Sequence, residues 1–505
     1  MKSYDILVIG GGINGCGIAR DATGRGYKVC LAEMNDLASG TSSWSTKLIH
    51  GGLRYLEYYE FRLVREALIE RETLWAMAPH IVRPLRFILP HHKGLRPAWL
   101  IRLGLFLYDY MGGRKKLPAT STVNLLNDAT GKPLKPMFSK GFEYSDCWVD
   151  DARLVVLNAV DASDTGAEIK VRTKVVSAKR VDGVWHAELE NTETGEIDTV
   201  QARLIVNAAG PWVDRVLNNA VGKENSKNVR MVQGSHIIVN KMFEHDRCYI
   251  FQNDDNRIIF AIPYEQDYTL IGTTDRDYNE DPGQVKITQE EIDYLCDAAS
   301  EYFKVPITEE DMVWNYSGVR PLYDDGASSA QEATRDYTLK LDEGESGEAS
   351  MVNIFGGKIT TFRKLAESMM EIVEEQIGEK QPKWTNGATL PGGSFKAEEN
   401  DALIAKITSD YPFLNQKIAT RLLHTYGMRT FRFLDGATSI EDMGEDFSGD
   451  TDAGLYAREI DYLIEVEWVR DSEDVLWRRS KLGIKIKGEA VTQLQAYIEK
   501  RRAPL

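Results

Sequence analysis

The feature that most constrains the fold is a G-x-G-x-x-G motif at residues 10–15. An apolar, β-branched segment at 4–9 precedes it, a segment with helical spacing at 13–26 follows it, and a second strand-like segment at 27–32 ends in Glu33. This order predicts a βαβ unit. The glycines would let a pyrophosphate approach N–H groups at the helix N-terminus, and Glu33 would accept hydrogen bonds from an adenosine ribose.

Composition restricts the classes of partner. The chain has 505 residues and a net charge of -16, which opposes general attraction to nucleic acid. Its five cysteines are odd in number and include no C-x-x-C pair, so neither a disulfide framework nor a metal site is predicted. We find no leader-like N-terminus and no apolar run long enough to span a bilayer, and therefore expect a cytoplasmic protein.

The rest of the chain alternates between strand-rich and helical regions. Short β-branched runs separated by turns predict a strand meander at 168–206, and a separate antiparallel sheet is expected after about residue 230. Residues 378–393 are typical of a linker, and helical patterns follow it. Within that tail, 435–474 holds 14 acidic and two basic residues, which predicts a solvated face.

A second glycine-containing segment favours FAD over NAD. Residues 207–212, Asn-Ala-Ala-Gly-Pro-Trp, end an apolar strand and resemble the strand end that covers the dinucleotide in FAD proteins of the glutathione-reductase-like superfamily. The chain has no second G-x-G-x-x-G motif and no redox C-x-x-C pair, which argues against a disulfide reductase. A single flavin that receives electrons from a substrate is therefore expected.

Four further segments make the resemblance specific. Residues 42–57, 143–154, 316–322 and 355–361, in this order, are similar to the FAD-dependent, respiratory, membrane-associated glycerol-3-phosphate dehydrogenase family. The resemblance runs essentially from end to end and includes Leu-Pro-Gly-Gly at 390–393. It implies oxidation of sn-glycerol 3-phosphate to dihydroxyacetone phosphate, with electrons passing through FAD to a membrane quinone.

The resemblance also implies an α/β architecture in three parts. We expect a glutathione-reductase-like FAD-binding domain with a βαβ Rossmann core, an antiparallel-sheet domain that faces substrate and membrane, and an α-helical C-terminal domain. The predicted boundaries are 1–75, 140–230 and 345–385 for the FAD-binding domain, 76–139 and 231–344 for the substrate domain, and 386–505 for the helical domain.

The expected FAD-binding residues come from the glycine motif, the segment after Glu33, the strand end near residue 208 and the turn at 357–361. They are Gly10, Gly12, Ile13, Asn14, Gly15, Glu33, Thr41, Ser42, Ser45, Lys47, Leu48, Val175, Ala208, Gly210, Trp212, Gly357, Lys358, Ile359, Thr360 and Thr361. At the start of a helix, Thr360 and Thr361 could stabilise negative charge on the flavin or simply cap the helix.

Oxidising a secondary alcohol phosphate requires a hydride acceptor, a proton acceptor and cations that hold the phosphate. By the resemblance, the substrate pocket is expected to contain Arg54, Tyr55, Arg320, Arg335 and Lys358. Arg320 and Lys358 are also predicted to be catalytic. His50 and His236 are the histidines nearest these motifs, and either imidazole could relay the proton; we favour His236 as the catalytic histidine.

A basic and aromatic stretch predicts how the protein meets a membrane. Residues 83–116 hold eight Lys or Arg against one Asp, interleaved with aromatic and aliphatic side chains. Such a stretch can bind an anionic lipid surface without spanning it, although a buried core helix at 95–111 is the alternative. We expect a cytoplasmic enzyme held peripherally on the inner face of the cell membrane; a homodimer is left open.

Three other functions remain open at this level. A glycerol-3-phosphate oxidase would pass its electrons to O2, and an amino-acid oxidase of the same superfamily would need a carboxylate clamp in place of a phosphate site. A non-catalytic flavin-binding sensor would use the acidic helical tail as its partner surface. The cluster of cations and the length of the resemblance favour the dehydrogenase.

Overall fold

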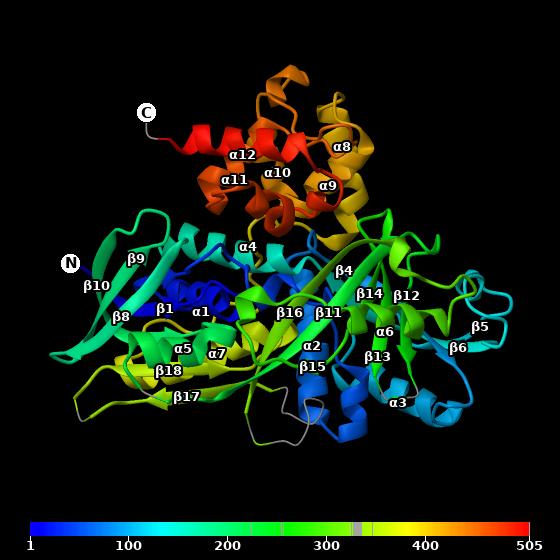
Figure 1. The fold of residues 1–505 in the computed structure, drawn as a ribbon, viewed down its shortest axis with the longest axis horizontal. Helices are drawn as coiled ribbons and strands as arrows, with labels where there is room; N and C mark the ends of the chain where they lie inside the picture. The colour runs from blue at the N-terminus through cyan, green and yellow to red at the C-terminus, as the bar shows by residue number, and fades with distance from the viewer. Residues whose placement is uncertain are drawn as a thin grey trace.

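The structure is a computed structural model that describes residues 1–223, 225–253, 255, 257–324, 326, 336–345 and 347–503. Two β-sheets lie side by side, and a group of helices from the end of the chain lies above them (Figure 1). The first sheet carries the N-terminal βαβ unit, and the second is built mainly from the middle of the chain.

The first sheet, called here the nucleotide sheet, has the strand order β17-β18-β10-β1-β2-β7, with β8 and β9 as a hairpin beside β10. The pairs from β18 to β7 along this order are parallel, as the βαβ unit requires. Helices α1 and α7 pack on each other, as do α1 and α4. The bounds are β1 (Lys2–Ile9), α1 (Ile13–Gly24), β2 (Val29–Ala32), α4 (Asp151–Asp164), β7 (Glu168–Lys170), β8 (Thr173–Val181), β9 (Val184–Asn191), β10 (Ile197–Asn207), α5 (Val213–Arg215), β17 (Thr338–Asp342), β18 (Ser350–Phe355) and α7 (Phe362–Ile377).

The second sheet, called here the large sheet, has the order β15-β11-β14-β13-β12-β4-β6-β3, with β16 beside β11 and β5 beside β6. Helix α6, which starts at a capping box on Thr288, packs on one face, and α2 and α3 pack on the other. The bounds are β3 (Leu48–Ile49), α2 (Phe61–Met77), β4 (Val82–His91), α3 (Ala98–Met111), β5 (Ser121–Asn124), β6 (Lys140–Val149), β11 (Val229–Asn240), β12 (Cys248–Gln252), β13 (Ile258–Tyr264), β14 (Tyr268–Gly272), β15 (Arg276–Asp277), α6 (Gln289–Ser300) and β16 (Met312–Tyr323).

The C-terminal helices form a domain with its own apolar core, as the sequence predicted. They are α8 (Asn400–Asp410), α9 (Gln416–Tyr426), α10 (Thr430–Leu434), α11 (Ala457–Glu467) and α12 (Glu489–Arg502). The expectation of a solvated acidic face is wrong in part, because Glu459, Glu467 and Asp474 are at most 1% exposed. These carboxylates pair with arginines that are buried or largely buried, which is how a protein interior accommodates charge.

Two predicted domain boundaries differ from the membership of the sheets. β6 lies in the range 140–230 that was assigned to the FAD-binding domain, yet it pairs with β4, β5 and β3 in the large sheet. β17 was assigned to the substrate domain, yet it pairs with β18 in the nucleotide sheet. In both cases the strand pairs with a different sheet from the one expected. Patterns of neighbouring residues do not predict which sheet a strand joins.

Candidate active site

A cavity of about 660 Å³ lies between the two sheets. Its walls come from the β1–α1 turn, the segment after β2, the strand end at 208–212, β16 and the turn at 356–360. These segments lie up to 350 residues apart in sequence, and Asn14 Nδ2 donates a hydrogen bond of 3.3 Å from the first to the Gly356 carbonyl in the last. The cavity therefore brings the predicted nucleotide cradle and the predicted substrate residues into one space.

The glycine turn has no room for side chains. A Cβ on Gly15 would lie 1.9 Å from the Gly10 carbonyl oxygen, and one on Gly10, whose φ is +111°, would lie 2.6 Å from the Ala208 oxygen. A Cβ on Gly12 would lie 3.2 Å from Ser42 Oγ, which accepts a hydrogen bond from the Ile13 amide. Because these glycines carry no side chains, a phosphate could approach the N-terminus of α1 closely.

Glu33 lies where a ribose acceptor is required. Its Oε2 accepts a 2.6 Å hydrogen bond from the Gly11 amide, and its Oε1 accepts one of 2.8 Å from the Asn35 amide. Burial raises the pKa of this carboxyl, while the two amide bonds oppose the rise. Nearby, Asn14 Oδ1 is buried and lacks a hydrogen-bond partner among the described residues. These features fit an adenine dinucleotide, because the cradle, the acidic acceptor and an unused acceptor atom face one cavity.

Three of the expected cations line the other part of the cavity. Arg320 forms a 2.5 Å ion pair with Asp275 and a 3.2 Å hydrogen bond with Thr273 Oγ1. Lys358 Nζ lies 3.8 Å from the centre of the Tyr55 ring. Arg54 donates to the Tyr58 hydroxyl at 3.2 Å. Arg335 lies outside the described residues.

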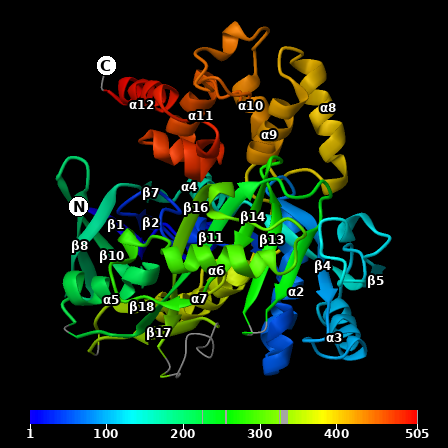
Figure 2. The ribbon, with the colours of Figure 1, turned by 45° about the vertical axis from the view of Figure 1, so that its right-hand side comes forward.

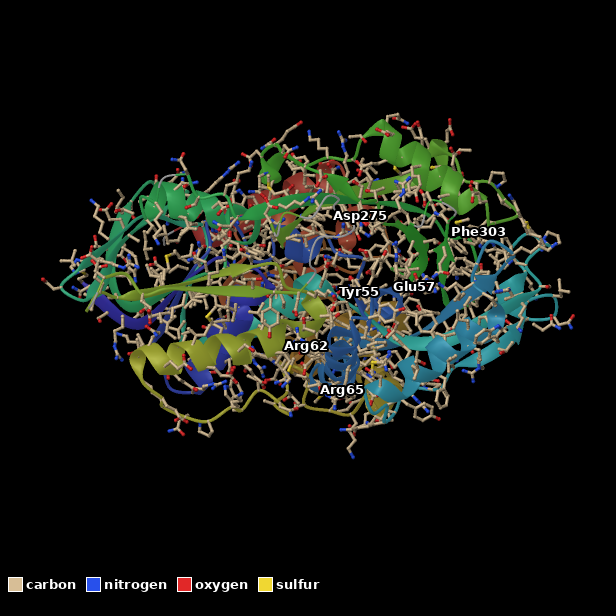
Figure 3. All side chains as sticks on the ribbon, turned by 90° about the horizontal axis from the view of Figure 1, so that it is seen from below. Tyr55, Glu57, Arg62, Arg65, Asp275 and Phe303 are labelled. Carbon is tan, nitrogen blue, oxygen red and sulfur yellow. The ribbon has the colours of Figure 1, made fainter. Side chains whose placement is uncertain are left out.

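Figure 3 shows Tyr55 and Asp275, which come from distant parts of the chain, near the middle of the molecule when it is seen from below. Both line the same cavity. Asp275 was missed from the sequence, although its position after the end of β14, in a Thr-Thr-Asp segment, is typical of strand-end residues that enter sites. Its carboxylate offsets part of the Arg320 charge, so the site is less cationic than the expected residues alone suggest.

The two histidines have different surroundings. His236 lies behind the cavity wall, stacked on Tyr316 at 4.7 Å between ring centres, and its Nε2 is 2.9 Å from the Thr46 hydroxyl. Thr46 lines the cavity, as does His50, whereas His236 is not part of its lining. Burial lowers the pKa of both imidazoles, and the Asp146 carboxylate partly opposes the shift at His50.

A buried network fixes the segment that follows His50. The Gly51 amide donates to the Tyr108 hydroxyl at 2.8 Å, and that hydroxyl donates to Asp146, 2.8 Å from Oδ2. Asp146 is also paired with Arg71 at 2.7 Å. Since Tyr108 belongs to α3, this helix holds the backbone between His50 and Arg54.

Three expected FAD-binding residues support the cavity from behind and do not line it. Gly15 packs under the turn, and Thr361 is buried at the start of α7. Lys47 is paired with Asp151 at 2.7 Å, and burial lowers the pKa of its ammonium group to about 8 against the influence of that carboxylate. The other expected FAD-binding residues line the cavity: Gly10, Gly12, Ile13, Asn14, Glu33, Thr41, Ser42, Ser45, Leu48, Val175, Ala208, Gly210, Trp212, Gly357, Lys358, Ile359 and Thr360.

Comparison with known families covers almost the whole chain. The FAD dependent oxidoreductase family matches residues 5–353, and the family described as the C-terminal domain of alpha-glycerophosphate oxidase matches residues 384–500. A glycerol-3-phosphate dehydrogenase of Pseudomonas aeruginosa is 51% identical over 496 residues, which is 98% of this chain and 95% of that protein. The chain belongs to the FAD-dependent glycerol-3-phosphate dehydrogenase family.

Other members of the family differ in the substrate they are named for. A D-erythritol 1-phosphate dehydrogenase of Brucella abortus is 52% identical over 480 residues, which is 95% of this chain and 94% of that protein. The solved structure of the Bacillus halodurans glycerol-3-phosphate dehydrogenase complexed with FAD covers 99% of this chain and 94% of its own, with a TM-score of 0.76 and 26% identity. The α/β FAD-binding fold, the substrate sheet, the helical C-terminal domain and FAD as cofactor are therefore confirmed.

Proposed function

We propose that the protein oxidises sn-glycerol 3-phosphate to dihydroxyacetone phosphate and passes the electrons to a membrane quinone. The observation that carries this proposal is the meeting of Arg54, Arg320 and Lys358 with the nucleotide cradle in one cavity. The 51% identical relative named glycerol-3-phosphate dehydrogenase supports the same substrate. When bound, FAD supplies the acceptor for the hydride equivalent.

The residues of the chain bind and orient the substrate in this proposal. Arg320 offers a planar guanidinium that can hold a phosphate through two parallel hydrogen bonds, and its contacts with Asp275 and Thr273 fix its orientation. Lys358, held over the Tyr55 ring, places a second charge near the same space. The substrate would be held by its phosphate while its secondary alcohol faces the flavin.

We assign the alcohol proton to His50 rather than to His236. His50 lines the cavity, and its depressed pKa keeps the imidazole neutral near pH 7, so that it can accept a proton. His236 is separated from the cavity by Thr46 and would need that hydroxyl as a relay.

The function is tested by adding sn-glycerol 3-phosphate to the flavin-bound enzyme without oxygen. Bleaching of the flavin absorbance at about one equivalent of substrate is expected, and no bleaching would reject the assignment. D-Erythritol 1-phosphate is the second candidate substrate, because a protein named for it is 52% identical. Comparing kcat/KM for the two compounds decides between them.

Arg320 provides a sharper test of the substrate pocket. Arg320→Ala is expected to raise the KM for the phosphorylated substrate at least tenfold, because a charge-assisted phosphate contact contributes roughly 1.5–3 kcal/mol. Flavin content should stay near that of the wild type. Equal losses of flavin and substrate affinity would mean that Arg320 maintains the fold instead.

The membrane part of the proposal is supported by α3. Its side chains Trp99, Leu103, Phe106, Leu107 and Tyr110 are 42–69% exposed. The helix lies at the end of the molecule away from α8–α12 in both ribbon views (Figures 1 and 2). Among the helices of the described residues, none is both long and apolar enough to cross a bilayer. We propose that this face inserts into the interfacial layer of an anionic bilayer, which holds quinone.

Quinone and oxygen as acceptors are separated by one measurement. With a soluble ubiquinone analogue under air, the quinone proposal predicts reduction of the analogue with little hydrogen peroxide. Stoichiometric hydrogen peroxide at the same rate with and without the analogue would favour an oxidase.

A further inference from the structure

A buried carboxylate ties the nucleotide cradle to the C-terminal domain. Asp36 is 1% exposed and lies in the segment between Glu33 and Thr41. Its two oxygens accept bonds of 2.8 Å each from the Nη atoms of Arg479, and Oδ2 also accepts one of 2.6 Å from Arg478 Nε. A carboxylate with three such bonds and no exposure to water is fixed in place.

The two arginines are themselves held by C-terminal residues. Arg479 donates from Nη2 to the Glu467 carbonyl at 2.6 Å, and Arg478 is paired with Asp474 at 2.5 Å. Both arginines lie in the short π-helix Asp474–Arg479, within the part of the chain that matches the separate C-terminal family. The position of Asp36 is therefore set by a domain that contributes no residue to the lining of the cavity described above.

Asp36 is connected to the cradle through the backbone around it. Glu33, three residues earlier, accepts from the Gly11 amide at 2.6 Å, and the Ala38 amide, two residues later, donates to the Gly11 carbonyl at 3.0 Å. Residues 33–35 and 38–42 line the FAD cavity, whereas Asp36 does not. Moving Asp36 would thus shift both sides of the segment that meets the cofactor.

Two more sets of contacts link the same wall to the C-terminal domain. The Arg172 amide donates to the Asn35 carbonyl at 2.9 Å, and its guanidinium pairs with Asp471 at 2.6 Å and Asp474 at 3.0 Å. Trp477 stacks on Trp314 with ring centres 4.0 Å apart. Trp314 in turn lies 6.2 Å from Trp44, a residue of the cavity wall.

We propose that the C-terminal helical domain is a clamp for FAD, in which Arg478 and Arg479 act as positioning residues. They hold Asp36, and through it the segment 33–44, closed over the adenosine and pyrophosphate part of the cofactor. The inference concerns retention of FAD and does not depend on which alcohol the enzyme oxidises.

The test measures the release of FAD from the holoenzyme through the rise in flavin fluorescence after dilution. Asp36→Asn and Arg479→Lys are expected to release FAD at least tenfold faster than the wild type. At saturating FAD, both variants should keep the KM of the wild type for substrate, because neither residue lines the cavity.

Arg421→Lys is the matched control. Arg421 forms a largely buried pair with Glu459, with two contacts of 2.7 Å, but this pair lies wholly within the C-terminal domain. The clamp predicts release of FAD at the wild-type rate from this variant. Unchanged release from Asp36→Asn, or equal acceleration in Arg421→Lys, would overturn the proposal, since either result makes the Asp36 cluster merely structural.

A milder variant keeps the proposal testable if Asp36→Asn does not fold. Arg478→Gln removes one of the three bonds to Asp36, together with the ion pair between Arg478 and Asp474, and leaves the Arg479 pair in place. It should release FAD severalfold faster than the wild type while its circular dichroism spectrum is unchanged. Release at the wild-type rate from this folded variant would also overturn the clamp.

Discussion

Helix α3 and the interface between the C-terminal helical domain and the rest of the protein, called here the junction, differ in which side chains they bury. α3 exposes aromatic and aliphatic side chains, with Trp99 69% exposed. The junction buries ions completely: Arg153 and Glu467 are paired there, and both are 0% exposed. Exposure to water therefore does not follow side-chain hydrophobicity in either region. A charged side chain can be buried where an oppositely charged one pairs with it, and an apolar side chain stays exposed where no other surface covers it.

The two regions therefore depend on different interactions: burial of apolar surface by a partner at α3, and pairing of opposite charges at the junction. An exposed apolar face gains free energy only when a lipid or protein surface covers it. A buried ion pair contributes only while both charges are present, and removing one leaves the other without water or a partner. Changes at the junction should therefore affect folding, and changes on the outer face of α3 should affect association.

The largest expected effect comes from breaking a buried pair. Arg153→Met should destabilise the fold by about 3–5 kcal/mol, because Glu467 keeps its charge in the interior after losing its main partner. Urea unfolding measures the change. Arg432→Met is the control, since this arginine is exposed and lies 4.0 Å from Glu465; a loss as large as that of Arg153→Met would remove the distinction between buried and exposed charge.

Acid should weaken the same junction by a smaller amount for each titrating group. Burial lowers the pKa of His80 to about 3, and burial together with the Arg83 guanidinium, 2.9 Å from Nδ1, lowers the pKa of His424 to about 3. Because both folded-state pKa values lie below the unfolded value of about 6.5, stability is full above that pH and declines as pH falls toward 3.

At pH 5 each histidine should cost about 2 kcal/mol relative to pH 7.5. Both ring nitrogens of His80 lack hydrogen-bond partners among the described residues, so His80→Leu removes a titrating group without breaking a bond there. Urea unfolding at the two pH values should show a smaller acid loss in this variant. The same loss as in the wild type would mean that His80 is not buried as the structure has it.

The smallest expected effect in free energy lies on α3. Phe106→Ser should weaken binding to anionic vesicles about tenfold, or about 1.4 kcal/mol, and change unfolding by less than about 0.5 kcal/mol. Sedimentation with vesicles measures the binding. Ile197→Ser, which removes a side chain that is 61% exposed on β10, should leave it unchanged. A change in unfolding without a change in vesicle binding would assign Phe106 to the fold.

The nucleotide cradle could be predicted because its chemistry is local. The order of strand, turn, helix and second strand in the sequence was enough to predict the roles of Gly10, Gly15 and Glu33. The backbone has no room for a side chain at either glycine. The basic and aromatic stretch at 83–116 was expected to bind lipid, and its helix α3 exposes apolar side chains. Its contact with lipid stays a prediction.

The partners of the charged residues could not be predicted, because they join distant segments. Nothing near Arg320 in sequence indicates its pairing with Asp275, 45 residues away. His236 was favoured as one of the two histidines nearest the segments that resemble the family, but its ring stacks on Tyr316 behind Thr46 and does not line the cavity. The acidic run after residue 435 was expected to face water. The sequence does not show that Arg153 and Arg478 form ion pairs with carboxylates of this run.

The bond between Asp36 and Arg479 joins residues 443 positions apart. A ribosome adds roughly 5–20 residues per second, so the segment after Glu33 emerges about 20–90 s before the guanidinium that fixes it. During that interval a nascent chain has its glycine turn but lacks the residues that secure it. The proposed clamp therefore places stable loading with flavin among the last events in the maturation of this enzyme, after nearly all of the polypeptide has been translated.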